Sequence, residues 1–335
     1  MGNVAALPDD RVYFRSYLAP LAALLERDDV TDIYVNRPGE AWAESLTGKI
    51  ETHEIPALTE QMLERLARQI AALSHQGINR EHPLLSATMP DGARVQIVAP
   101  PATRGTMALA IRKHVSPDLR LEDYADSGAF AATKAGKIGD TNALDKQLHD
   151  LLGAGDIPAL LRTAVQSRKN ILISGGTSSG KTTFLNALLR EVPERERLIL
   201  IEDTPEITIR HPNAVGLLAA RSALGETHTT AEDLLSASLR LRPDRIILGE
   251  LRGVEAFSFL RAVNSGHPGS MTTIHADSPE RAIEQLTLLV LQSGSRLDRT
   301  DVHHYVRSTV DVFVQLGRSG GKRHIAEVKL REAGA

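Results

Sequence analysis

The chain of 335 residues contains no cysteine, few aromatic residues and no long apolar run. Without cysteine it can have neither a disulfide framework nor a thiolate metal site, which suits a reducing compartment. Its longest apolar runs, such as 286–291, are far too short to span a bilayer, and no cationic segment before an apolar run marks a signal peptide. We therefore expect a cytoplasmic protein that reaches a membrane only through partners.

A strong excess of charge is also missing. The sequence has 39 basic and 42 acidic residues, a net charge of −3. Proteins whose main function is to bind nucleic acid are more often basic, because they neutralise phosphates with lysine and arginine. We therefore expect no direct specific binding of nucleic acid.

The length suits two domains, each able to bury its own core.

The most informative feature that is present is the run 175–183, which fits the nucleotide-binding pattern G-x-x-x-x-G-K-[ST]. In this pattern glycines let backbone N–H groups reach the β-phosphate, a lysine reaches the β- and γ-phosphates, and a hydroxyl ligates Mg²⁺. A short buried strand over 170–174 and a helix over 183–190 flank the run, which places the phosphate at a helix N-terminus. The candidate binding residues are Gly175, Gly176, Thr177, Ser178, Ser179, Gly180, Lys181, Thr182 and Thr183. We expect the chain to bind ATP with Mg²⁺, the metal ligands being Thr182 and an acidic residue.

Residues 1–114 mix helical and strand patterns. Apolar residues at helical spacing predict an amphipathic helix over 59–75, and short β-branched runs predict strands over 31–36, 94–98 and 107–112. This first part is expected to be an α+β domain.

The periodicity fades over 115–148, where glycines interrupt the chain. We interpret this stretch as an interdomain linker with one short helix near 121–124. A linker of this length would let the first domain pack on a neighbouring subunit.

Residues 149–335 alternate β-branched runs with helical patterns. The expected strands are 170–174, 198–201, 245–248 and 270–274, followed by a hairpin closed at 319–321. Strands that alternate with helices predict an α/β domain with a mainly parallel sheet covered on both faces.

Acidic residues follow two of these strands, at the sheet edge where such domains place their chemistry. The run 201–206 (IEDTPE) offers a carboxylate that could orient and deprotonate the attacking water of an ATPase. Its alternative is an ordinary acidic turn. The strand 245–248 leads to Glu250, about seventy residues beyond the phosphate loop, where a carboxylate would lie beside Mg²⁺ or the water. Taken alone, any buried strand could end in glutamate.

His275 ends the strand over 270–274 and could sense the γ-phosphate through a hydrogen bond. Metal ligation by His275 and His267 is the alternative, but no acid or cysteine completes a recognisable ligand set.

Arginines form the last group of candidates. Arg94 and Arg112 lie on predicted strands of the first domain, and Arg242 precedes Pro243. Charge on a transferred phosphoryl group favours planar bidentate donors, often from another domain or subunit. For each arginine alone, a solvated surface position is the simpler explanation.

In the order GGTSSGKTT, IEDTPE, RPDRIILGELRG and GHPGSMTTIHA, these motifs resemble the secretion (traffic) ATPases, specifically the hexameric ATPases of bacterial type IV secretion systems. Residues 90–98 and 111–113 are similar to that family's N-terminal domain, so the resemblance covers roughly 15–330. It implies a RecA-like ATPase domain preceded by a smaller α+β domain. It further implies a ring-shaped homohexamer, peripheral to the cytoplasmic face of the bacterial inner membrane and bound to inner-membrane components of a secretion system.

The resemblance also implies a role for each site residue. Lys181 and Thr182 would hold phosphate and Mg²⁺, Glu206 would be the catalytic glutamate supported by Glu202 and Asp203, and Glu250 the Walker B acid. His275 would be the histidine-box residue, and Arg94, Arg112 and Arg242 would contact the phosphates. The chain departs from the family at His114, where proline is common, and it lacks the tetracysteine module of many type II relatives.

Two alternative functions remain at this point. A pilus or type II secretion motor would share the same chemistry. A DNA translocase or helicase would require tight, steeply salt-dependent binding to DNA, which the charge balance does not suggest.

Overall fold

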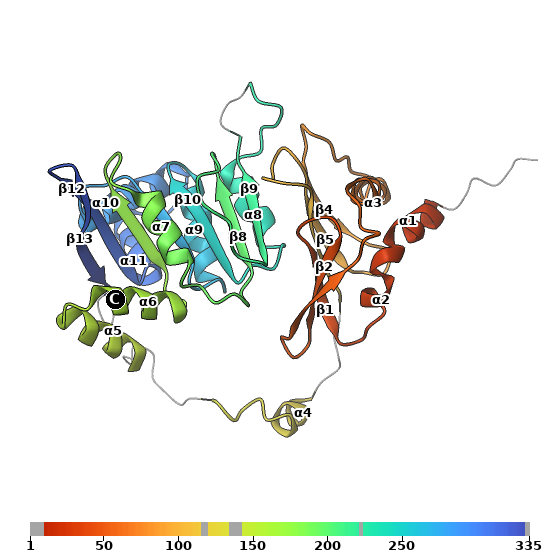
Figure 1. Cartoon of the computed structure of the whole chain (residues 1–335), viewed down its shortest axis with the longest axis horizontal. Helices are drawn as coiled ribbons and strands as arrows, with labels where there is room; N and C mark the ends of the chain where they lie inside the picture. The colour runs from red at the N-terminus through yellow and green to blue at the C-terminus, as the bar shows by residue number, and fades with distance from the viewer. Residues whose placement is uncertain (1–9, 115–119, 134–142, 221–223, 332–335) are drawn as a thin grey trace, which may run out of the picture.

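The computed structural model describes residues 10–114, 120–133, 143–220 and 224–331. They form two separate sheets that lie next to each other (Figure 1). The first sheet is antiparallel, in the order β3-β2-β1-β6-β5-β4, and the second is mainly parallel, in the order β13-β12-β7-β11-β10-β8-β9. This confirms the expected fold class, a mainly parallel α/β domain preceded by a smaller α+β part.

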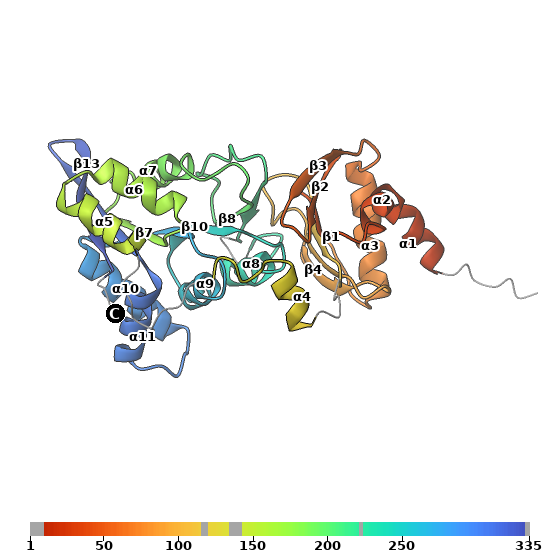
Figure 2. The same cartoon turned by 90° about the horizontal axis from the view of Figure 1, so that it is seen from below.

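The first sheet carries its helices on the face turned away from the second sheet (Figure 2). Thr59 caps the long helix of this layer by accepting the N–H of Met62 at 3.2 Å. The strands are β1 (Val30–Val35), β2 (Glu40–Ser45), β3 (Ile50–Glu54), β4 (Leu84–Thr88), β5 (Arg94–Val98) and β6 (Ala108–Arg112). The helices are α1 (Asp10–Leu18), η1 (Ala19–Leu21), α2 (Ala22–Leu25) and α3 (Glu60–Leu73). The predicted helix and strands of this part are therefore present, all three strands within one residue of their predicted bounds.

In the second sheet, six strands run parallel and only β13 is antiparallel to its neighbour. The strands are β7 (Ile171–Gly175), β8 (Leu198–Glu202), β9 (Ala214–Leu218), β10 (Arg245–Leu251), β11 (Met271–Ile274), β12 (Val312–Ser319) and β13 (Lys322–Leu330). Because the parallel strands point the same way, their carboxyl ends meet at one edge. Strand β9, at the end of the sheet, is the one that the sequence did not predict.

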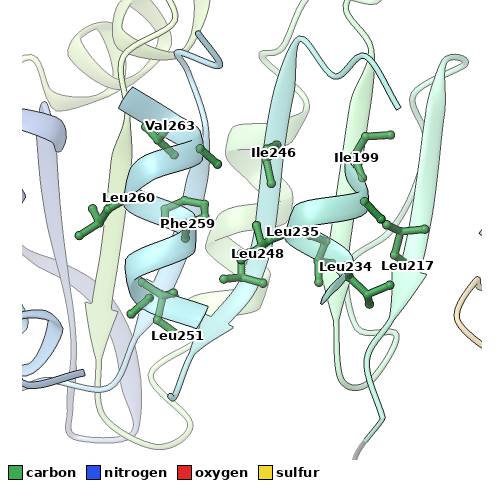
Figure 3. Packing of buried hydrophobic residues seen from close by; sticks show 14 of the residues in the cluster. Ile199, Leu217, Leu234, Leu235, Ile246, Leu248, Leu251, Phe259, Leu260 and Val263 are labelled. Atoms are coloured by element: carbon green, nitrogen blue, oxygen red, sulfur yellow. The ribbon is translucent and has the colours of Figure 1, made fainter. Parts of the chain in front are cut away.

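Helices cover both faces of the second sheet (Figure 2). On one face lie α5 (Ala143–Gly153), α6 (Ile157–Gln166) and α7 (Lys181–Leu189). On the other lie α8 (Ala231–Ser238), α9 (Glu255–Asn264), α10 (Pro279–Gln292) and α11 (Arg299–Thr309). Figure 3 shows Leu235 of α8 and Phe259 of α9 packed against the apolar side chains of β8, β9 and β10. This double layer explains why the strands read as nearly continuous apolar runs.

The predicted linker needs one correction. The short helix is present as α4 (Leu121–Asp126), but α5 already begins at Ala143. Leu148, at the predicted boundary, is buried in one cluster with Leu160 and Ile171. The second unit therefore begins earlier than 149, because the amphipathic face of α5 packs on α6. Residues 115–119 and 134–142 of the linker lie outside the described ranges, and the rest of the proposed division remains a prediction.

The two halves share an interface that is both apolar and polar. The loop between β5 and β6 runs along β9: Thr103 bridges Leu217, and the backbone N–H of Leu218 donates to Ala102 at 2.9 Å. Nearby, the fully buried guanidinium of Arg197 lies 4.3 Å from the centre of the Tyr34 ring. Burial lowers the pKa of Arg197 to about 10. Within the described ranges, no helix combines the length and apolar character needed to cross a membrane.

Candidate active site

The phosphate loop follows β7 and leads into α7. Gly180 occupies the N-cap position of α7 with φ +93°, a conformation that residues with a side chain rarely adopt. Gly175 packs so closely on Ser179 that an added Cβ would lie 2.4 Å from the serine oxygen. Nothing lies within 4 Å of a Cβ at Gly176, which leaves that stretch of backbone open. The loop therefore presents its N–H groups at a helix N-terminus, as anion binding requires.

Lys181 brings three strand ends together. Its Nζ donates to the carbonyl oxygen of Gly175 at 3.0 Å and lies 3.6 Å from Oε1 of Glu250 and 3.2 Å from Nδ1 of His275. The partners come from the ends of β7, β10 and β11 respectively. The three predicted residues thus converge on one point at the carboxyl edge of the sheet.

The acidic residues of the 201–206 run have different positions. The Thr182 hydroxyl donates to Oε2 of Glu206 at 3.0 Å. Glu202 is buried, and its Oε1 accepts the backbone N–H groups of Glu206 at 2.9 Å and Ile207 at 2.8 Å. Glu206 is therefore the carboxylate of this run that faces the phosphate loop, whereas Glu202 holds the backbone that carries it.

Glu250 is paired with an arginine to which the sequence analysis gave no role. Arg252 Nε donates to Oε2 of Glu250 at 2.8 Å, and Arg252 Nη1 donates to Asp203 at 2.6 Å. The bond to Glu250 raises the pKa of Arg252. The arginine thereby ties the two acidic motifs together. It stands two residues beyond Glu250, and a guanidinium so close to a predicted catalytic acid was a usable signal.

These groups surround a cavity of about 740 Å³, large enough for a nucleoside triphosphate. Arg323 of β13 also lines it and donates to the carbonyl oxygen of Ser178 at 3.1 Å. Its contribution could not be predicted, because the hairpin lies far along the chain from the phosphate loop. The cavity is lined by Gly176, Thr177, Ser178, Ser179, Gly180, Lys181, Thr182, Thr183, Glu202, Asp203, Thr204, Glu206, Gly249, Glu250, Leu251, Arg252, Thr273, Ile274, His275, Gln285 and Arg323.

The donor set fits Mg²⁺ bound as a nucleotide complex. In the part of the chain that the structure describes, no group of three or more His, Cys, Asp or Glu side chains could hold a metal. Mg²⁺ commonly takes one or two protein oxygens and completes its shell with phosphates and waters. The hydroxyl of Thr182 and the carboxylate of Glu250 are oxygen donors of this kind at the cavity.

The three predicted arginines lie elsewhere. Arg242 precedes β10, at the opposite end of the strand from the cavity, and donates to Oε1 of Glu44 at 2.6 Å. Arg112 is exposed and lies 4.0 Å from Asp32, and Arg94 is its partner across β5 and β6. Burial raises the pKa of Asp32, and the nearby charges of Arg112, Glu44 and Arg242 make smaller contributions. Within one chain, these arginines therefore do not reach the phosphate loop.

The two histidines are also separated. His267 precedes β11 and approaches the carbonyl oxygen of Pro243 at 3.1 Å, whereas His275 follows the same strand. Burial lowers the pKa of His267. Because they lie at opposite ends of β11, His267 and His275 cannot share a metal ion.

A mainly parallel sheet with a phosphate loop at its carboxyl edge, two acidic motifs and a histidine around one cavity defines a P-loop ATPase. A family model described as "Type II/IV secretion system protein" matches residues 141–327. The type IV secretion system protein VirB11 of Bartonella henselae is 39% identical over 340 residues, covering 97% of this chain and 95% of that protein. The protein PtlH of Bordetella pertussis is 39% identical over 98% of both chains.

Among solved structures, the VirB11 ATPase of Brucella suis, crystallised with sulphate, superposes with a TM-score of 0.89 at 38% identity, over 96% of this chain and 95% of that one. The chain belongs to the type II/IV secretion system family, on the type IV side represented by VirB11 and PtlH. It is a secretion ATPase, as the motifs predicted.

Proposed function

We propose that this ATPase works as a Mg²⁺-dependent, ring-shaped homohexamer at the cytoplasmic face of the bacterial inner membrane, where it powers substrate transfer or pilus biogenesis by a type IV secretion system. The observation that carries the chemical part is the convergence of Lys181, Glu250 and His275 at one cavity, with the Thr182–Glu206 pair beside them. Attachment to the membrane would come through inner-membrane components of the secretion system.

In the proposed reaction a water attacks the γ-phosphate in line, and the chain supplies position and charge. Mg²⁺, when bound, would neutralise charge on the phosphates. Lys181 would bind the β- and γ-phosphate oxygens. The neutral carbonyl oxygen of Gly175, which now accepts a hydrogen bond from Lys181, would compete only weakly with them. Glu206 would accept a proton from the water, and Glu250 would supply an oxygen ligand to the metal. His275 would report the γ-phosphate through the hydrogen bond that it now makes with Lys181.

The arginines lead to the oligomeric part of the proposal. Arg94, Arg112 and Arg242 gather near Asp32 and Glu44, away from the cavity of their own chain. In a ring, one subunit could present this group to the nucleotide of its neighbour, which is how phosphoryl-transfer enzymes often receive an arginine. The site would then be complete only in the assembled ring.

The test is Mg²⁺-dependent ATP turnover per subunit over a range of protein concentrations, with sizing at each concentration. We expect turnover to require Mg²⁺, to rise as the ring assembles and to vanish in Lys181→Ala. Lys146→Ala, which removes an exposed lysine on α5, serves as the matched control. A fully active monomer would contradict the composite site, and turnover retained in Lys181→Ala would remove the phosphate loop from the mechanism.

A further inference from the structure

The loop between β5 and β6 sends one charged side chain across to the second sheet. Arg104 belongs to this loop, and its guanidinium pairs with the carboxylate of Glu202 through Nη2 and Oε2. Only 16% of the Arg104 side chain and 4% of the Glu202 side chain are exposed. Arg104 Nη1 also donates to the carbonyl oxygen of Ile207 at 2.5 Å. Arg104 thus touches both ends of the segment that carries Glu206.

The backbone around Arg104 allows its side chain to extend to Glu202. Its own N–H donates to the carbonyl oxygen of Gly216 in β9 at 2.9 Å. A Cβ at Gly216 would lie 2.6 Å from Cδ of Arg104, so this strand position has to be free of a side chain for the arginine to pass. Strand β9 therefore both anchors the loop and leaves the path by which Arg104 reaches Glu202.

Glu202 links Arg104 to the active site by binding the backbone of the segment that carries Glu206. Its other oxygen, Oε1, accepts the N–H groups of Glu206 and Ile207. A buried carboxylate that loses its cation is costly and tends to rearrange. Arg104 pairs with that carboxylate and holds it in place, which in turn fixes the backbone from which Glu206 reaches Thr182.

We propose that Arg104 is a positioning residue through which the N-terminal half sets the geometry of Glu206: docking of the β5–β6 loop on β9 aligns the carboxylate, and withdrawal of the loop releases it. Arg104 does not line the nucleotide cavity, so it acts through Glu202 and never on the phosphates. The inference rests on the proposed catalytic role of Glu206.

The first experiment measures ATP turnover by the full chain carrying Arg104→Met. We expect kcat to fall about tenfold, within the usual range for coupled buried pairs, while KM for ATP and nucleotide affinity stay unchanged. Arg104→Lys should recover part of the loss. The control is Arg80→Gln, because Arg80 also crosses between the halves, pairing with Glu226 at 3.0 Å on the surface. If Arg80→Gln lowers kcat as much, Arg104 merely contributes to domain packing and the inference is wrong.

The second experiment is a double-mutant cycle with Glu202→Gln, which keeps an oxygen acceptor for both N–H groups but needs no cation. If Arg104 acts through Glu202, Arg104→Met should cost less than about twofold in kcat in the Glu202→Gln background. An equal loss in both backgrounds would overturn the inference. Should Arg104→Met fail to fold, Arg104→Lys in the two backgrounds answers the same question.

The third experiment separates this inference from the proposed function. Amide hydrogen exchange of residues 203–210 should be faster in Arg104→Met, because the N–H groups of Glu206 and Ile207 lose a fixed acceptor. Unchanged exchange would overturn the role of Arg104 and leave Glu206 untouched. Faster exchange with unchanged kcat would overturn the role assigned to Glu206, since its backbone would then be free to move without effect.

Discussion

Thr182 and Glu206 both line the nucleotide cavity and contact each other, the threonine hydroxyl donating to the carboxylate at 3.0 Å. In a phosphate loop the same hydroxyl is expected to ligate Mg²⁺. The two contacts compete for one hydroxyl group, so Glu206 would lose this donor when the metal nucleotide binds. Its carboxylate would then be available to a water molecule.

Glu206→Gln tests that assignment directly. A glutamine cannot accept a proton from water, and the loss of a general base lowers a rate by about 100-fold or more. We expect kcat to fall by this amount with ATP affinity retained, as measured by steady-state turnover and by binding of a fluorescent ATP analogue. Glu232→Gln, on α8 and bonded to Ser258, is the matched control and should be fully active. Wild-type turnover in Glu206→Gln would show that the proton goes elsewhere.

Glu250→Gln should produce a different defect. The amide would lose its charge pairing with Lys181 and Arg252 and would be a weaker oxygen ligand for Mg²⁺. We expect turnover at least about tenfold lower, and a higher Mg²⁺ concentration for half-maximal activity, read from Mg²⁺ titrations at fixed ATP. Glu255→Gln is the control, because Glu255 accepts the backbone N–H groups of Arg252 and Gly253 and does not line the cavity. An unchanged Mg²⁺ requirement would place the metal away from Glu250.

Mixing two defective variants tests whether the arginines act between subunits. Arg112→Ala should lower turnover without unfolding the chain, since Arg112 is exposed. If Arg112 serves the neighbour's nucleotide, mixed rings of Arg112→Ala and Lys181→Ala contain some sites with both residues intact. We expect mixtures to recover activity above either variant alone, up to about a quarter of the wild-type rate per site for random assembly. Mixtures no more active than the variants would refute a shared site.

Tyr34→Phe tests the polar part of the interface between the two halves. The Tyr34 hydroxyl donates to the buried carboxylate of Glu44, which also accepts a hydrogen bond from Arg242. The ring of Tyr34 packs on the guanidinium of Arg197. Phenylalanine keeps the ring and removes the donor, so we expect a loss of about 1–3 kcal/mol in the free energy of unfolding. Calorimetry should show a lower melting temperature. Tyr124→Phe makes the same change at an exposed position on α4 and should leave it unaltered.

The sequence predicted the secondary structure best where one periodicity dominates. Helix α3 has a clear apolar stripe and a threonine cap, so it was found nearly residue for residue. The β-branched run of β5 was found with its observed bounds. Strand β9 was missed because it has five residues with glycine at the centre. That glycine is there for a contact with Arg104, about a hundred residues earlier, which no local pattern contains.

The convergence of three predicted site residues was foreseeable for a topological reason. In a parallel sheet, residues at the ends of successive strands come together whatever their separation in the chain, and Lys181, Glu250 and His275 do so. Contacts that depend on how two folded units dock have no such rule. Arg104 on Glu202 and Arg197 under Tyr34 were therefore invisible in the sequence, and the action of Arg94, Arg112 and Arg242 between subunits remains a prediction.

Strand β9 ends the second sheet, and the β5–β6 loop occupies part of its outer side through Thr103, Arg104 and Ala102. An uncovered edge strand offers its free N–H and C=O groups to any other extended chain and invites aggregation. The loop that we propose positions Glu206 therefore also covers an edge that could otherwise pair with another chain. Any movement that lifts the loop to switch the ATPase off would expose, for as long as it lasts, a strand that is ready to pair with another molecule.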